Sequence, residues 1–217
     1  MTTTARILLI GCMVLLLASC RKEESASYSI SGKVTDADDN TPLTGVQVEV
    51  EKQVVQNGIF GNTYQRALIT ATNNNGEYQG SWPRENFAAL RILTELENYI
   101  AAEISLDIDA FEGGQTVRQD IALHKEAFAS LRFLHNGGNV SDRLSFTFLN
   151  ANFNCSCCSN GWKTWQSAQI DTTFTCRVYG NRWLKYQVQT QFGFTDSTFV
   201  DSIYCVAFDT TSRAIQY

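Results

Sequence analysis

The stretch Val46-Gln47-Val48-Glu49-Val50-Glu51 alternates a valine with a polar residue over six consecutive positions. Successive side chains of a β-strand point to opposite faces of the sheet, so the three valines would share one face and the polar residues the other. This spacing predicts a strand with one buried face and one solvated face. It is the most regular alternation in the chain, and shorter stretches of the same period lie on both sides of it.

These shorter alternations are separated by residues that favour turns. Within the first 125 residues, apolar side chains recur at every second position in the stretches 30–34, 78–82, 90–96, 100–108 and 117–123. Residues 36–42 are rich in turn formers, and the Asn-Gly pair at 75–76 is a strong hairpin signal. About seven strands and no convincing helix are expected, so residues 28–125 are predicted to form a β-sandwich.

Three motifs in this region resemble the carboxypeptidase regulatory-like domain, a transthyretin-like sandwich. They are Ser31-Gly32-Lys33-Val34-Thr35-Asp36, Pro42-Leu43-Thr44-Gly45-Val46-Gln47-Val48 and Ala71-Thr72-Asn73-Asn74-Asn75-Gly76-Glu77-Tyr78. Pro42 would fix the turn into the strand, Gly45 would begin the strand without a side chain, and Gly76 would supply the positive φ of a tight hairpin. The resemblance implies a mainly non-catalytic spacer or docking module.

The sequence contains none of the usual catalytic motifs. Some proteins of this topology hydrolyse cyclic ureides with histidines and a terminal Tyr-Arg-Gly-Ser, whereas this chain has only His124 and His135, expected on a solvated strand face and beside a turn. A nucleophile motif, a zinc motif and a phosphate-binding glycine loop are all missing. In the acidic turn at 36–40, Thr41 and Gln47 stand where a calcium loop needs glycine and glutamate. We therefore predict no catalytic residue, no metal and no cofactor.

The second half of the chain repeats the pattern of short strands. After Phe128, alternation recurs at residues 131–133, 144–148, 174–178, 184–192 and 199–208. Residues 127–217 are therefore predicted to form a second, disulfide-stapled β-sandwich, immunoglobulin- or fibronectin-like. The predicted fold class is all-β, with two consecutive sandwiches.

The amino-terminal residues have the order of an export signal. Arg6 precedes an apolar run at 7–17, and Leu17-Ala18-Ser19-Cys20 resembles the lipobox of bacterial lipoproteins. The resemblance implies a signal peptide at 1–19, acylation of Cys20 and a tether at 20–27. The other interpretation is a transmembrane helix, but the run is too short to cross about 30 Å of hydrocarbon.

The expected location follows from this anchor. Lys22-Glu23-Glu24 resembles the surface-export tag of lipoproteins in one phylum of Gram-negative bacteria. We expect a lipid-anchored protein of the outer membrane, displayed at the cell surface, with the periplasmic face as the alternative. The net charge of −5 and the absence of a basic stripe argue against a nucleic-acid partner.

The cysteines that remain after processing all lie in the second half: Cys155, Cys157, Cys158, Cys176 and Cys205. Thiols usually pair in an exported protein, and five thiols allow at most two bridges. Bridges from the loop that carries the first three to Cys176 and Cys205 are expected, with the pairing left open. A soft-metal site is the alternative, although Cys-x-Cys-Cys lacks the paired spacing of structural zinc sites.

Two tryptophans and four hydroxyl residues complete the candidate sites. Trp162 and Trp165 flank the cysteine-rich loop and could stack on a sugar or contact a protein partner, or could simply cap the core. Four tripeptides resemble the Asp-Ser/Thr-aliphatic/Thr sites that the same bacterial phylum O-glycosylates, with acceptors at Thr172, Ser197, Ser202 and Thr210.

The predicted function is therefore a non-catalytic, lipid-anchored envelope protein that acts as a binding, display or structural module, with a glycan or another envelope protein as its partner. Two alternatives stay open. One is a glycan-binding accessory lipoprotein that uses Trp162 and Trp165. The other is a metal- or redox-handling lipoprotein that uses the cysteine cluster.

Overall fold

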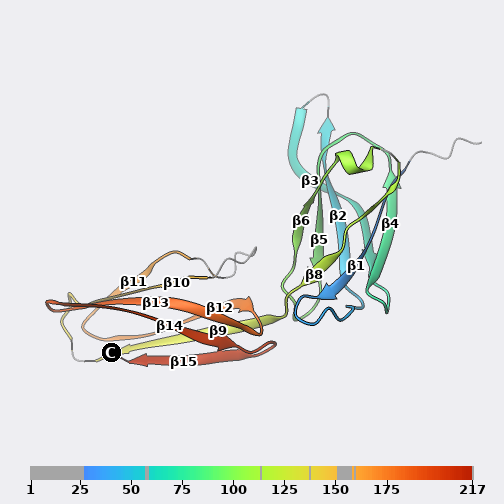
Figure 1. Ribbon diagram of the computed structural model, residues 1–217. Coiled ribbons are helices and arrows are strands. Elements are labelled where there is room, and N and C mark those ends of the chain that lie inside the picture. Colours follow the sequence, from blue (N-terminus) through green and yellow to red (C-terminus); the bar gives the residue numbers. More distant parts are fainter. Residues whose placement is uncertain are drawn as a thin grey trace, which may run out of the picture.

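The computed structural model is all-β and contains two β-sandwiches, one after the other along the chain (Figure 1). It describes residues 27–56, 59–112, 114–136, 138–150, 158 and 160–216. Within these ranges the helical structure is a single 3-10 turn, η1 (Asp109–Phe111). The predicted fold class is confirmed.

The first sandwich consists of two four-stranded sheets. One has the order β4-β1-β7, with β8 also paired to β1, and the other has the order β3-β2-β5-β6. The strands of the first sheet are β1 (Ser27–Asp36), β4 (Glu77–Pro83), β7 (Thr116–Arg118) and β8 (Ile121–Leu123). Those of the second are β2 (Gln47–Gln56), β3 (Ile59–Ala71), β5 (Phe87–Glu95) and β6 (Glu103–Leu106). The strand β1 is antiparallel to β4 and parallel to β7 and β8.

The alternating stretch that begins at Val46 places its side chains as predicted. Val46, Val48 and Val50 are fully buried and belong to a core that extends from Ile30 to Leu123. On the opposite face, Glu49 and Glu51 form ion pairs with arginines of the neighbouring strands.

The second sandwich packs a four-stranded sheet against a three-stranded one. The orders are β11-β10-β13-β14 and β12-β9-β15, and β15 runs parallel to β9. The strands of the first sheet are β10 (Arg143–Phe148), β11 (Lys163–Gln166), β13 (Arg182–Phe192) and β14 (Thr195–Cys205). Those of the second are β9 (Glu126–His135), β12 (Ile170–Tyr179) and β15 (Thr210–Gln216).

The core of the second sandwich is separate from the first and is rich in aromatic rings. Its buried residues run from Ala127 to Ile215. Phe146 lies at its centre, with ring centroids 4.8 Å from Phe133 and 5.2 Å from Phe174. Each sandwich therefore buries its own apolar residues. The first core ends at Leu123 and the second begins at Ala127.

Several elements differ from the sequence-based prediction. The strands β3, β11 and β15 were not predicted, because their sequences lack a regular apolar alternation and their side chains are largely exposed or half-buried. The predicted strand at 100–108 is shorter, since only Glu103–Leu106 pairs with β5. Its last predicted residue, Ile108, instead precedes the 3-10 turn.

The glycines in the three motifs that resemble the carboxypeptidase regulatory-like domain are required for different structural reasons. Gly45 and Gly76 have φ of 74°, a backbone region that side chains with a Cβ disfavour. Gly32 is required for a different reason, because a Cβ there would clash with the carbonyl oxygen of Gln119. That oxygen also accepts a hydrogen bond of 2.6 Å from the Tyr78 hydroxyl, so it cannot move away without breaking this bond.

These two kinds of glycine predict a measurable difference in stability. Gly32→Ala should lower the free energy of unfolding by about 3 kcal/mol, because the new methyl group overpacks a buried contact. Gly45→Ala has no neighbour within 4 Å of its Cβ and should cost only about 1–2 kcal/mol, from its left-handed backbone. Urea unfolding of both variants tests this ordering, and an equal or smaller loss for Gly32→Ala would contradict it.

Candidate functional sites

The two sandwiches meet at a joint formed by buried charges. Asp36 ends β1, and its side chain is only 2% exposed. Its Oδ2 atom lies 2.8 Å from the Lys125 Nζ atom, at the boundary between the two halves, and accepts a hydrogen bond of 2.9 Å from the Tyr99 hydroxyl. Its Oδ1 atom accepts the backbone N–H of Asp38 at 2.8 Å. The carboxylate is therefore held by three donors.

The electrostatics of the joint favour the charged forms. Burial alone would raise the pKa of Asp36, but the hydrogen bonds from Lys125, Asp38 and Tyr99 outweigh burial, and its pKa lies below the ordinary value. The hydrogen bond to Asp36 raises the pKa of Lys125. Desolvation and the hydrogen bond to Asp36 raise the pKa of Tyr99 to about 12, so its hydroxyl stays protonated and donates.

Side chains of the second sandwich complete the joint. Asp38, in the turn after β1, accepts hydrogen bonds of 3.1 Å from both Arg182 and Asn181. The guanidinium of Arg177 donates to the Tyr99 carbonyl oxygen at 3.0 Å and is paired with Glu126. These contacts link loops of the first sandwich to β9, β12 and β13 of the second.

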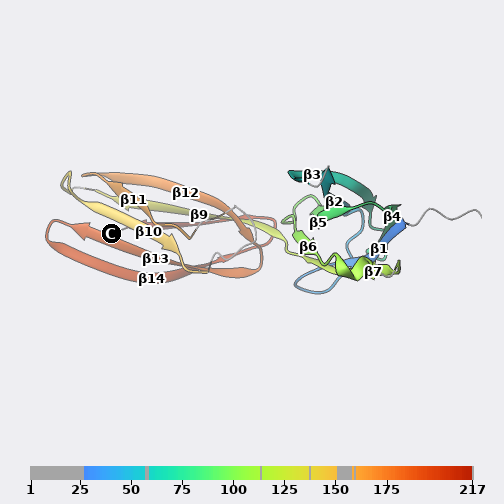
Figure 2. The same cartoon turned by 90° about the horizontal axis from the view of Figure 1, so that it is seen from above.

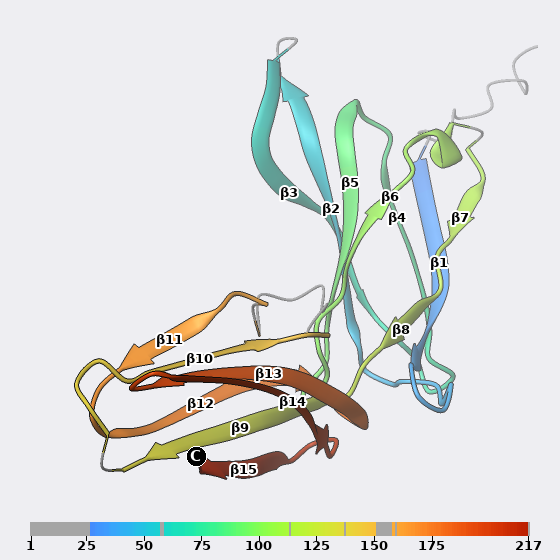
Figure 3. The ribbon, with the colours of Figure 1, turned by 60° about the vertical axis from the view of Figure 1, so that its left-hand side comes forward.

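Aromatic and backbone contacts strengthen the same joint. The Tyr99 ring packs edge-on against Phe208, with centroids 5.8 Å apart. His124, predicted to be solvated, is half-buried and stacks on Tyr179 at 4.0 Å. The backbone N–H of Glu126 donates across the boundary to the Asn98 carbonyl oxygen, and that of Gly180 donates to the Lys125 carbonyl oxygen. In Figures 1 and 3 the strands of one sandwich run across those of the other, and Figure 2 shows the two sandwiches next to each other along the molecule.

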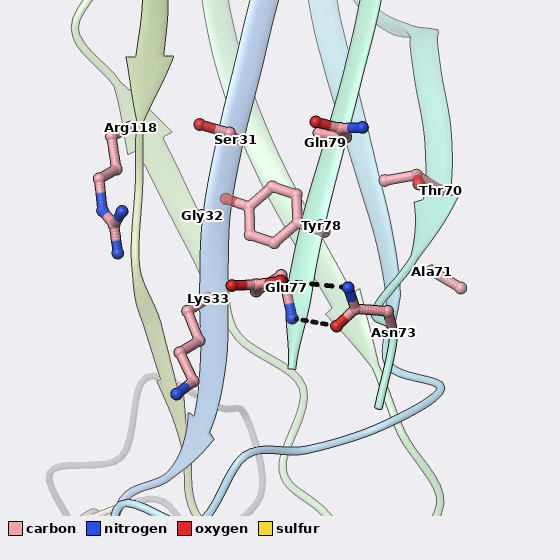
Figure 4. A pocket seen from close by; sticks show the side chains of 10 residues that line it. All are labelled: Ser31, Gly32, Lys33, Thr70, Ala71, Asn73, Glu77, Tyr78, Gln79 and Arg118. Carbon is pink, nitrogen blue, oxygen red and sulfur yellow. Dashed lines mark hydrogen bonds between the residues drawn. The ribbon is translucent and has the colours of Figure 1, made fainter. Parts of the chain in front are cut away.

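One cavity of the first sandwich is lined by polar side chains that belong to the fold. The cavity drawn in Figure 4 has a volume of about 500 Å³ and is lined by residues of β1, β3, β4 and β7. Its polar side chains stabilise the fold, since Asn73 and Glu77 bond to each other and Tyr78 bonds to Gln119. Within the described residues, no cluster of three or more His, Cys, Asp or Glu side chains could hold a metal ion.

The cysteines are divided between one bridge and one free thiol. Cys158 and Cys176 form a disulfide that ties the loop before β11 to β12. Cys205, which was expected to be a second bridge partner, is instead a free, buried thiol. Burial raises the pKa of this thiol to about 11, so it carries no thiolate at neutral pH. Cys20, Cys155 and Cys157 lie outside the described residues.

The two predicted tryptophans have different environments. Trp165 packs against the core, and its ring is parallel to that of Phe146 at 5.6 Å, so it caps the sandwich. Trp162 is 49% exposed just before β11. A third indole, Trp183 in β13, is 59% exposed; it was not among the predicted site residues. The structure therefore does not bring Trp162 and Trp165 together on one surface.

The four candidate glycosylation residues are spread over the second sandwich. Ser197 and Thr210 are exposed, near the ends of β14 and β15. Thr172 and Ser202 are half-buried within β12 and β14. The exposed pair is the more accessible to a modifying enzyme.

No protein-family profile and no curated protein matches the chain. Among solved structures, it is similar to the Bacillus anthracis TIE protein, with 9% identity over 88% of this chain and 34% of that one, at a TM-score of 0.37. It is also similar to a streptococcal ancillary pilin (12% identity, 88% of this chain, 63% of that one, TM-score 0.33) and to GBS52, the minor pilin of Streptococcus agalactiae (12%, 87%, 94%, TM-score 0.32). The chain spans about a third of the first protein and less than two thirds of the second. Because every TM-score is below 0.5, what these proteins do is not transferred to this chain.

The disulfide predicts a specific loss of stability. Replacing both Cys158 and Cys176 by alanine should lower the free energy of unfolding by about 3 kcal/mol, because the bridge closes a segment with a sequence separation of 18. A reducing agent should cause a similar loss in the wild type. An unchanged urea midpoint in the double variant would contradict a stabilising role, and a further loss on reduction of that variant would point to another cysteine pair.

Proposed function

We propose that this chain is a non-catalytic, lipid-anchored envelope protein whose two sandwiches form one rigid unit for binding or display. The observation that carries the proposal is the joint, because Asp38 and Tyr99 of the first sandwich bond to Arg182, Asn181 and Arg177 of the second, around the buried Asp36–Lys125 pair at the boundary. A linker that only needed to connect two domains would not require a buried and fully hydrogen-bonded carboxylate.

The position of the joint supports a spacer role for the first sandwich. The strand β1 begins at Ser27, next to the proposed tether, and ends at Asp36 in the joint. A strand of ten residues is about 30 Å long, so β1 alone separates the proposed tether from the joint by about that distance. The carboxypeptidase regulatory-like resemblance, with its implied spacer or docking role, agrees with this arrangement.

The other parts of the proposal concern location and modification. We place the protein at the outer membrane, facing outward, on the basis of the lipobox and the Lys22-Glu23-Glu24 tag. Within the described residues, no helix is long and apolar enough to cross a membrane. O-glycosylation of the second sandwich is proposed at Ser197 and Thr210 in preference to Thr172 and Ser202. The metal- or redox-handling alternative is less well supported, because a disulfide uses Cys158 and Cys176 and burial protects Cys205.

Lipid attachment gives the first prediction from this proposal. In the native host, the wild-type chain should fractionate with membranes, and its mature amino terminus should be an acylated Cys20. Cys20→Ala should abolish acylation, and this variant should then be found in a different cell fraction from the wild type. Mass spectrometry of the amino-terminal peptide provides the measurement, and an unmodified terminus at any other residue would contradict the anchor.

The joint gives a second prediction, tested by a double-mutant cycle. Lys125→Met should lower the free energy of unfolding by about 3 kcal/mol, because it leaves the Asp36 carboxylate buried without its cation. Asp36→Asn should cost less, since Lys125 Nζ keeps Asp38 and Asp39 at 3.8 and 3.6 Å. The double variant should lose less than the sum of the two single losses, which shows that the two groups are coupled.

The exposed ion pair between Arg132 and Asp171 is the matched control for this cycle. Both side chains are more than half exposed, so Arg132→Met should cost less than about 1 kcal/mol.

The sign of the pH dependence provides a further readout. The pKa of Asp36 is lower in the folded protein than its ordinary value of 3.8. The contribution of this carboxylate to the free energy of unfolding is therefore complete above pH 3.8 and is lost as the pH falls below that value. Additive losses, or equal losses for Lys125→Met and Arg132→Met, would contradict a joint held by this pair.

A further inference from the structure

We infer that the outer face of the sheet β11-β10-β13-β14 binds a neutral glycan, with Trp183 as the stacking platform. This inference rests on the proposed role as a non-catalytic display unit, because the face must be accessible beyond the membrane. It moves the predicted sugar contact away from Trp165, which is packed against the core.

The strand β13 places three amides and one indole on a single face. Its buried residues Leu184, Tyr186, Val188 and Thr190 alternate with Trp183, Lys185, Gln187, Gln189 and Gln191, which therefore face outward. From Trp183 to Gln191 this row is about 27 Å long. It is long enough to follow several sugar rings of an extended oligosaccharide.

The three glutamine amides are not used by the fold. Within the described residues, no side-chain hydrogen bond is made by Gln187, Gln189 or Gln191. Each amide offers two donors and one acceptor, the combination that matches a sugar hydroxyl. Their neighbours in register are mixed: Gln189 lies between Ser145 and Thr198, Gln187 between Thr147 and Val200, and Gln191 between Arg143 and Asp196.

The corresponding face of the first sandwich is chemically different. There, Glu49, Glu51 and Glu103 are neutralised by Arg66 and Arg91 in ion pairs. A surface whose charges satisfy one another has few free groups left for a ligand. The amide face of β13 is therefore a distinct feature of the second sandwich and not a general property of the exposed sheets.

Trp183 is held in place at one end of the row. Its ring packs against that of Tyr204, its partner in register on β14, with centroids 5.4 Å apart at 62°. The Asn150 side chain fixes the backbone beneath it, donating to the Trp183 carbonyl oxygen at 2.9 Å and accepting the Lys185 N–H at 2.8 Å. An indole that is both exposed and held can stack on the apolar face of a sugar with little loss of conformational entropy.

A hollow beside this indole can receive one end of the ligand. It has a volume of about 350 Å³, and its lining includes Trp183, Asn150 and Arg182 together with His124 and Tyr179 from the joint. Small-molecule sites commonly combine an aromatic wall with a few polar groups in this way. The hollow lies at the Trp183 end of the amide row and adds further polar groups to the proposed site, including the Arg182 guanidinium.

The chemistry of this face favours a glycan over other partners. A nucleic acid would require a row of cations, whereas the central positions of β13 are glutamines. A protein interface would need a larger apolar centre, whereas the exposed apolar side chains of this hairpin are dispersed, with Trp183 and Tyr204 at one end, Val200 beside Gln187 and Phe194 at the other end. A neutral polyhydroxylated chain matches both parts, with its C–H face on the rings and its hydroxyls on the amides.

The test uses the full-length chain, purified in a detergent without a sugar head group and probed with an array of neutral gluco-, manno-, xylo- and galacto-oligosaccharides. The wild type should bind at least one class, with the affinity then measured by calorimetry. Trp183→Ala should weaken binding about tenfold or more, and Trp183→Tyr should retain most of it. Replacing Gln187, Gln189 and Gln191 by alanine should also weaken binding.

Phe194→Ala is the matched control, because it removes a fully exposed aromatic side chain from the far end of the same hairpin. It should bind like the wild type, and all variants should keep the wild-type melting temperature. No binding to any neutral oligosaccharide, or wild-type affinity of Trp183→Ala, would overturn the inference. A chain that binds glycan but has no acyl group would instead overturn the proposed anchor, so the two failures are distinguishable.

Discussion

The two halves of this molecule meet around one buried carboxylate. Asp36 terminates the first strand of one sandwich and pairs with Lys125, directly before the first strand of the other, with Tyr99 as a third partner. Next to this pair, Asp38 bonds to Arg182 and the Tyr99 carbonyl oxygen accepts from Arg177, so a rotation of the second sandwich would break these contacts. Two cores that are independent in their packing are therefore coupled in their orientation.

This coupling allows the two sandwiches to have different surfaces. The first sandwich neutralises its outward charges in arginine–glutamate pairs, which suits a spacer. The second leaves its glutamine amides free and exposes Trp183 on the same face. Because Arg182 beside Trp183 also bonds to Asp38 of the joint, the proposed ligand site is next to the contact that sets the orientation. Binding and display would then depend on the same few residues.

The sequence predicted the features that depend on local period and missed those that depend on distant neighbours. Val46, Val48 and Val50 revealed both the strand and its buried face, because alternation is a property of consecutive residues. The joint was missed because Asp36 and Lys125 are far apart in the chain, and the acidic turn was interpreted as an ordinary polar loop. Trp162 and Trp165 were paired by their proximity in sequence, although Trp162 lies exposed before β11 while Trp165 lies within it and packs against the core. The free thiol of Cys205 could not be distinguished from a bridged one by counting cysteines.

The central claim is that the joint holds the two sandwiches in one orientation. The most direct measurement is the distance distribution between spin labels introduced as unnatural amino acids at Gln79 in β4 and Thr198 in β14, both exposed. At neutral pH the account predicts a single narrow distribution, which broadens in the Lys125→Met variant while both sandwiches remain folded. A broad distribution in the wild type, or one that Lys125→Met leaves unchanged, would contradict it.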